Sequence, residues 1–86
     1  MDARRKRLLF QSRHRGMQEN DLLLGGFAEG NMATLDDAGL DSFERLLDEG
    51  DNDLFNWISG KEPVPASFDD ELMARLKDFR NSLVSS

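Results

Sequence analysis

Hydrophobic positions recur every three or four residues over most of the chain, which is the spacing of one face of an α-helix. The clearest stripe has steps of 4, 4, 3 and 4 and consists of Phe68, Leu72, Leu76, Phe79 and Leu83. No alternating run of β-branched residues indicates a strand, and no hairpin dipeptide lies between two apolar runs. The pattern therefore predicts an all-α fold.

Turn and cap residues divide this pattern into five helices. Pro63 and Pro65 form a rigid connection before the last of them. We expect helices at 3–13, at about 17–31, from Thr34 as N-cap to Gly50, from Asp51 as N-cap to Gly60, and from Ser67 as N-cap through the stripe described above. Five helices with short connections in 86 residues predict a compact five-helix bundle, a single domain spanning residues 1–86.

Gly25 and Gly26 fall inside the second predicted helix. A glycine in a helix interior costs roughly 1 kcal/mol relative to alanine. Close packing by a neighbouring helix would offset this cost, so we expect another element to approach the chain at this point.

The size of the chain limits the core that it can build. A domain of 86 residues buries only about 60–65% of the surface of its unfolded chain, so its stability is modest. The chain has no cysteine, which excludes disulfides and thiolate metal sites and suits a reducing compartment. Trp57 has apolar neighbours on both sides, and we interpret it as a core residue in preference to an interface anchor.

Charge is distributed unevenly along the chain, whose net charge is −6. Residues 1–15 contain six basic residues and one acidic residue, whereas the remainder contains five basic and sixteen acidic residues. The acidic surplus would repel phosphate, so we expect no binding to nucleic acid. The basic cluster at 4–7 opposes the helix dipole in a first turn. It is either a solvated helix end or an electrostatic arm for a negatively charged partner.

No membrane or secretory segment is expected. The longest apolar run, Leu22 to Leu24, has three residues, against the roughly 18 that a membrane span needs, so we expect no direct membrane insertion. The N-terminus is rich in arginine but lacks the apolar region of a secretory signal, and Asp2 argues against a mitochondrial presequence. We therefore expect a bacterial, cytoplasmic protein.

Neither catalysis nor a metal site is expected. His14 is the single histidine, so the chain can form neither a metal site with two histidines nor a Ser–His–Asp triad with spare parts. The acidic pairs all fall at predicted helix starts, where capping explains them. The glycines at 25–30 follow no strand and lack the spacing of a dinucleotide-binding loop.

The segment R-G-M-Q-E, residues 15–19, lies between the first two predicted helices. Gly16 can serve as a left-handed cap, or it can leave a gap that another backbone approaches closely. Beside it, Arg15 offers a bidentate fork and Glu19 and Asp21 offer acceptors. On physical grounds two interpretations stay open: a turn in which Arg15 and Glu19 pair locally, and a surface that binds another protein.

This segment resembles the R-G-x-x-E motif of the succinate dehydrogenase assembly factor 2 family, the small flavinylation factors of bacteria and mitochondria. The resemblance continues through Asp21, F-x-R-L-L at 43–47 and D-x-D-L-F-N-W at 51–57. It covers most of residues 4–80 in order, and the combination of the two motifs is specific.

The resemblance implies a five-helix protein that is not itself an enzyme. It implies binding, as a monomer, to the flavoprotein subunit of succinate dehydrogenase or of fumarate reductase. Binding promotes covalent attachment of FAD to a histidine of that subunit, a reaction that the subunit performs on itself. The chain lacks a dinucleotide fingerprint, so we expect no tightly held FAD. The expected partner-binding residues are Arg7, Arg13, His14, Arg15, Gly16, Glu19 and Asp21.

The resemblance also leaves a second function open. Some members of the family are described as the antitoxin half of a toxin–antitoxin pair. The alternative expectation is therefore an inhibitory module that binds a protein toxin.

Overall fold

The structure, a computed structural model, describes residues 2–85, and within this range it contains helices but no strand. The helices are α1 (Ala3–Arg13), α2 (Gln18–Asn20), α3 (Gly26–Asn31), α4 (Asp37–Leu47), α5 (Asp51–Ser59) and α6 (Glu71–Ser85). A π-helical turn, η1 (Asp21–Gly25), joins α2 to α3, and the 3₁₀ turns η2 (Met32–Thr34) and η3 (Ala66–Phe68) precede α4 and α6. Because α2, η1 and α3 form one continuous helical segment, the predicted all-α bundle of five helices is confirmed.

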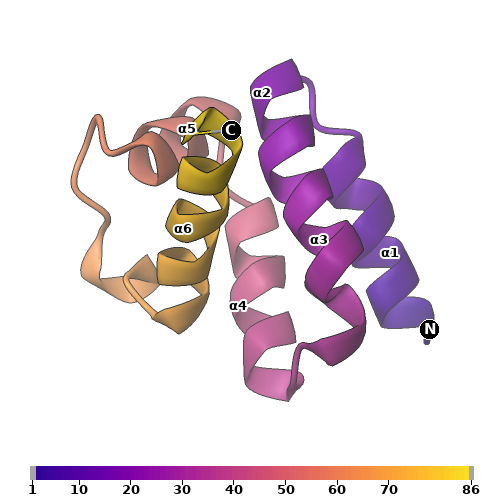
Figure 1. The fold of residues 1–86 in the computed structure, drawn as a ribbon. Coiled ribbons are helices and arrows are strands. Elements are labelled where there is room, and N and C mark those ends of the chain that lie inside the picture. The colour runs from indigo at the N-terminus through magenta and orange to yellow at the C-terminus, as the bar shows by residue number, and fades with distance from the viewer. Residues whose placement is uncertain (1, 86) are drawn as a thin grey trace.

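The helices pack around a small apolar core. Figure 1 shows α1 beside the segment from α2 to α3, with α4 between this pair and the pair of α5 and α6. Every helical segment contributes to the core, whose most deeply buried large side chains are Leu8, Leu24, Phe27, Met32, Phe43, Leu46, Leu54, Met73 and Leu76. Trp57 is only 7% exposed and stacks on Phe68, with 5.3 Å between ring centroids. The interpretation of Trp57 as a core residue is confirmed.

Two of the expected helix caps are wrong by two or three residues. Asp36, instead of Thr34, caps α4, because its carboxylate accepts a main-chain N–H of the first turn at 2.8 Å. Asp70, instead of Ser67, accepts the corresponding N–H at the start of α6 at 3.0 Å. In both places the cap is a carboxylate and not the expected hydroxyl. The negative charge of the carboxylate also complements the helix dipole.

Gly25 and Gly26 lie where neighbouring helices approach most closely. A β-carbon at position 25 would lie 3.0 Å from Cγ of Arg13 and 3.4 Å from its Cα, in α1. A β-carbon at position 26 would lie 3.1 Å from Cζ of Phe79, in α6. The expected close packing is therefore confirmed, and it involves one helix on each side.

Replacing Gly25 with valine should lower the free energy of unfolding by about 1–3 kcal/mol, because the side chain would meet the α1 backbone. The measurement is urea unfolding followed by circular dichroism. Gly30→Val is the matched control, because Gly30 lies in α3 and a β-carbon at this position would have no neighbouring atom within 4 Å. Equal losses of stability in the two variants would contradict the close approach.

Candidate partner-binding site

The side chain of Arg15 points into the protein. It is only 11% exposed, and its Nε donates to Oδ1 of Asp51 at 2.6 Å. Its Nη1 and Nη2 donate to the main-chain oxygens of Leu47 and Glu49, each at 2.7 Å. The guanidinium therefore joins the end of α4 to the start of α5. A cation at this point also complements the partial negative charge at the C-terminus of α4.

Asp51 accepts hydrogen bonds from two residues of the motif region. Besides Arg15, Nδ2 of Asn20 donates to its carboxylate at 3.1 Å and to its main-chain oxygen at 2.9 Å. Burial raises the pKa of Asp51, but the hydrogen bonds from Arg15 and Asn20 and the charge of Arg15 outweigh it and leave the pKa below its ordinary value. Gly50 is the N-cap of α5, so the expectation that Asp51 caps this helix is wrong. Asp51 instead anchors the 15–20 segment to the α4–α5 turn.

Asn20 is fully buried, and its Oδ1 has no hydrogen-bond partner among the described residues. An unsatisfied buried acceptor costs stability, typically about 1–3 kcal/mol. The side-chain NH₂ of Asn20 thus makes two hydrogen bonds to Asp51, while its side-chain oxygen stays without a donor from the described residues.

Asp21 also acts inside the chain, because its Oδ1 accepts the main-chain N–H of Arg15 at 2.7 Å. Glu19 differs from both: its side chain is exposed and forms no hydrogen bond or ion pair with residues 2–85. The local Arg15–Glu19 pair that the sequence left open is therefore not formed. The motif separates into inward groups, Arg15 and Asp21, and an outward carboxylate, Glu19.

Gly16 and Glu19 line an open depression of about 700 Å³, together with residues 17–18 and 50–53. Gly16 does not have a positive φ, so it does not form the left-handed cap, one of the alternatives that the sequence left open. A β-carbon at this position would meet only Oδ2 of Asp51, at 3.8 Å, which is an ordinary contact. Neither the backbone conformation nor internal packing requires glycine here.

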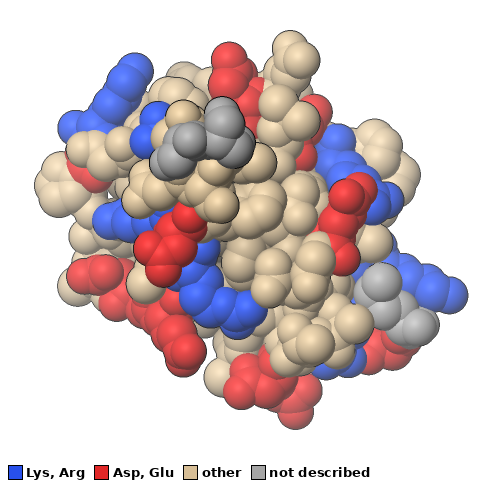
Figure 2. All heavy atoms as spheres, viewed as in Figure 1, with Lys and Arg blue, Asp and Glu red and all other residues tan. Residues whose placement is uncertain are grey.

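The basic cluster at 4–7 does not form a free electrostatic arm. Arg4 and Arg7 both bind Glu44 of α4, each at 3.1 Å, and Arg5 donates to two main-chain oxygens in the connection between α3 and α4, at 3.0 and 2.6 Å. On the face shown in Figure 2, basic and acidic side chains lie interspersed. The arm interpretation is therefore corrected: the three arginines hold α1 against the rest of the bundle.

The remaining expected residues, Arg13 and His14, lie at the end of α1. Arg13 forms an exposed ion pair with Glu29 of α3. His14 is exposed and stacks on Phe10, with 4.0 Å between ring centroids and 19° between ring planes. Its Nδ1 donates to the main-chain oxygen of Phe10 at 2.7 Å, since a carbonyl oxygen can only accept.

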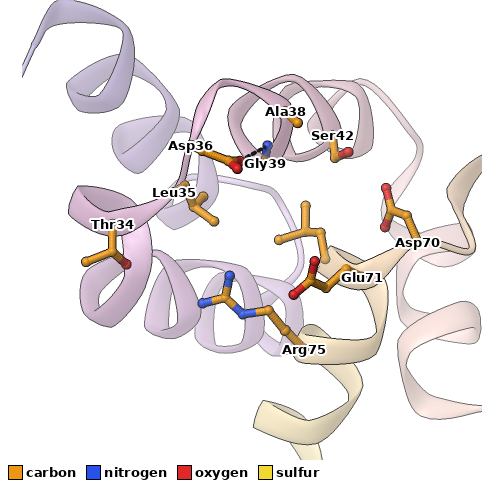
Figure 3. A pocket seen from close by; sticks show the side chains of 10 residues that line it. Thr34, Leu35, Asp36, Ala38, Gly39, Ser42, Asp70, Glu71 and Arg75 are labelled. Atoms are coloured by element: carbon orange, nitrogen blue, oxygen red, sulfur yellow. Dashed lines mark hydrogen bonds between the residues drawn. The ribbon is translucent and has the colours of Figure 1, made fainter.

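A different depression, of about 310 Å³, lies between the N-terminal ends of α4 and α6 (Figure 3). Its polar groups serve the fold, because Asp36 caps α4 and Arg75 donates to Asn31 at 2.8 Å. We therefore assign no site to this depression.

Within residues 2–85, no group of three or more His, Cys, Asp or Glu side chains is placed to hold a metal ion. The same part of the chain has no helix with the length and apolar character that crossing a membrane requires.

Comparison with known proteins decides which family this arrangement represents. The family described as "Flavinator of succinate dehydrogenase" (Sdh5) matches residues 6–80. The chain belongs to this family. The resemblance expected from R-G-x-x-E and D-x-D-L-F-N-W is thereby confirmed.

Three curated relatives of this flavinator family carry the name "Succinate dehydrogenase assembly factor 2, mitochondrial". One from Dictyostelium discoideum is 49% identical over 69 residues, which are 80% of this chain and 49% of the relative. One from Mycosarcoma maydis is 52% identical over 60 residues, 70% of this chain and 25% of the relative. One from Danio rerio is 40% identical over 81 residues, 92% of this chain and 51% of the relative. The chain thus spans about half the length of these relatives, or less.

These relatives correct the expected location. They are eukaryotic proteins named as mitochondrial, which overturns the expectation of a bacterial, cytoplasmic protein. The expectation relied on the acidic residue near the N-terminus, and one such residue is weak evidence about targeting.

Two residues that organise the site were not identified from the sequence of this flavinator family member. Asp51 was interpreted as a helix cap, although it lies in the D-x-D-L-F-N-W segment that carries the family resemblance. Asn20 gave no signal, because a single asparagine in a polar segment has no periodicity. Asp51 accepts from Arg15, 36 positions away along the chain, and Asn20 donates to Asp51 across 31 positions.

Proposed function

We propose that the chain binds the flavoprotein subunit of succinate dehydrogenase and promotes covalent attachment of FAD to it, without catalysing the reaction itself. The family match over residues 6–80 and the assembly-factor names of the relatives support this function. The observation that carries the site is Gly16, an exposed glycine that its own fold does not require, next to the outward carboxylate of Glu19.

In this proposal the two outward groups of the motif contact the subunit. Gly16 allows a main-chain segment of the subunit to approach closely, because no side chain covers the surface there. Glu19 accepts charge-assisted hydrogen bonds from that segment. Docking favours the conformation of the subunit in which its histidine and the flavin are aligned for reaction. The flavoprotein subunit of fumarate reductase is a second client of the same site.

Arg15 and Asp21 act through position in this mechanism. Arg15 holds the α4–α5 turn, which forms one wall of the depression, and Asp21 holds the main chain of Arg15. The wall also carries Asp51 and Asp53, whose charges disfavour the diphosphate of free FAD. We therefore propose that FAD stays with the subunit and that the chain, as a monomer, supplies a docking surface.

Gly16→Arg should reduce covalent flavin in the subunit at least tenfold, and Glu19→Ala should reduce it by a smaller factor. Arginine at position 16 blocks close approach, whereas alanine at position 19 removes a single contact. The measurement is flavin fluorescence of the flavoprotein subunit on denaturing gels, after co-production with each variant in cells that lack the endogenous factor. Gly30→Arg is the matched control, because Gly30 is also exposed and lies away from the depression.

The free proteins must remain folded for this comparison. Position 16 has room for a side chain, so the unfolding free energy of Gly16→Arg should lie within about 1 kcal/mol of wild type. Wild-type levels of covalent flavin with both Gly16→Arg and Glu19→Ala would reject the site. If cells with the wild-type chain contain no more covalent flavin in the subunit than cells without it, the proposed function is rejected.

A further inference from the structure

We call the depression that Gly16 and Glu19 line the first depression. A second depression, of about 310 Å³, lies next to it and opens between the end of α1 and the end of α4. Its lining includes the stacked rings of Phe10 and His14 on one helix and Leu47 and Asp48 on the other. Asp51 lines this depression and also the one that contains Gly16 and Glu19. A partner that covers the first depression would therefore reach the second without a gap.

Phe10 is a large apolar side chain that the fold leaves 62% exposed. It is nevertheless held in place, because its ring stacks on His14 and its main-chain oxygen accepts the Nδ1 hydrogen of that histidine. An aromatic ring that is already ordered loses little conformational entropy when a partner covers it, which is typical of interface anchors. Leu22 is equally exposed but lines neither depression.

Asp48 supplies an unused charge in the same depression. Its side chain is exposed and forms no hydrogen bond or ion pair with the described residues. Asp51, in contrast, already accepts from Arg15 and Asn20. The second depression thus offers an aromatic ring, an aliphatic side chain and a carboxylate that residues 2–85 leave available.

We infer that this second depression binds an arginine side chain of the flavoprotein subunit. The inference rests on the proposed function, and it adds Phe10, Leu47 and Asp48 to the docking surface. The methylene stem of an arginine packs on Leu47, its planar guanidinium stacks on an aromatic face, and its N–H groups pair with a carboxylate. A phosphate or a carboxylate of the partner would be repelled by Asp48, whereas the charge of Asp51 is already paired with Arg15, which also lines this depression.

The test measures the dissociation constant between the purified flavoprotein subunit and each variant of the 86-residue chain by biolayer interferometry, at about 50 and 300 mM NaCl. Phe10→Ala should raise the dissociation constant about tenfold, as truncation of an aromatic anchor does. Asp48→Asn should raise it about fivefold at low salt and less at high salt, because the lost contact is electrostatic. Leu22→Ala and Asp69→Asn are the controls, an exposed leucine and an exposed aspartate outside both depressions, and both should stay within twofold of wild type.

Each other outcome overturns a defined part of the inference. Wild-type affinity for both Phe10→Ala and Asp48→Asn, together with loss of binding in Gly16→Arg, overturns the second depression and leaves the proposed function standing. Weak binding by Phe10→Ala with wild-type affinity and salt dependence for Asp48→Asn overturns the arginine and indicates an apolar occupant. A wild-type chain that does not bind the subunit overturns the proposed function and this inference together.

Discussion

Replacing Arg15 with alanine should lower the free energy of unfolding by about 3 kcal/mol. Removing one partner of a buried ion pair typically costs about 3–5 kcal/mol, and we take the lower end because the carboxylate of Asp51 is 28% exposed. The substitution also leaves the main-chain oxygens of Leu47 and Glu49 without the donors that they have in the native fold. Urea unfolding followed by circular dichroism measures the change.

Arg13→Ala is the matched control for this loss. Arg13 also forms an ion pair, with Glu29, but both side chains are substantially exposed, so the cost should stay below about 1 kcal/mol. A similar loss of stability in both variants would show that the position of Arg15 inside the fold has no special importance.

Acid should remove the same contribution in the wild-type protein. The pKa of Asp51 lies below its ordinary value of 3.8 in the folded chain. Its ion pair therefore contributes fully above pH 4 or so, and the contribution is lost as the pH falls through the folded pKa. The stability difference between wild type and Arg15→Ala should shrink below about pH 4. Asp2, whose pKa is lowered chiefly by the main-chain N–H of Arg5, titrates in both proteins and cancels in this difference.

Trp57→Ala should cost about 3–5 kcal/mol, as truncation of a buried aromatic side chain does. Trp57 lies in α5 and stacks on Phe68, and the guanidinium carbon of Arg45 lies 5.0 Å from the centre of the Phe68 ring. Removing the indole leaves a cavity where α5 meets the turn before α6. Because small domains are only about 5–15 kcal/mol stable, the variant should be partly unfolded at 37 °C.

Thermal and urea unfolding by far-ultraviolet circular dichroism measure this effect without relying on the indole signal. Phe10→Ala provides the comparison, since Phe10 is an aromatic residue that is 62% exposed, and its stability should change by less than about 0.5 kcal/mol. A cost below about 1 kcal/mol for Trp57→Ala would contradict its placement in the core.

The R-G-x-x-E motif therefore combines two physical roles in five residues. Its arginine stabilises the turn behind the surface, whereas its glycine and glutamate lie on the surface itself. An arginine substitution and a glycine substitution should consequently fail for different reasons: the first by unfolding, the second by loss of binding in a folded protein. Measurements of stability and affinity on the same variants separate the two.

The helix content, the core and the family were accessible from the order of residues alone. A helix that buries one face repeats its apolar side chains every three or four positions, so Leu72, Leu76 and Phe79 marked α6 without reference to any other helix. The close approach at Gly25 and Gly26 was predictable for a similar reason, because a helix retains two costly glycines only where something packs against them.

The direction of the charged side chains was decided only by the tertiary structure. Arg15 meets Asp51 across 36 positions and Arg4 meets Glu44 across 40, and local periodicity carries no information about such distant acceptors. An arginine near a turn can equally point outward to a partner or inward to helix-end carbonyls, because acceptors in either place can pair with its guanidinium. The fold brings the α4–α5 turn beside Arg15, where two main-chain oxygens and the carboxylate of Asp51 accept its N–H groups. Arg15 therefore points inward, while Gly16 and Glu19 stay at the surface.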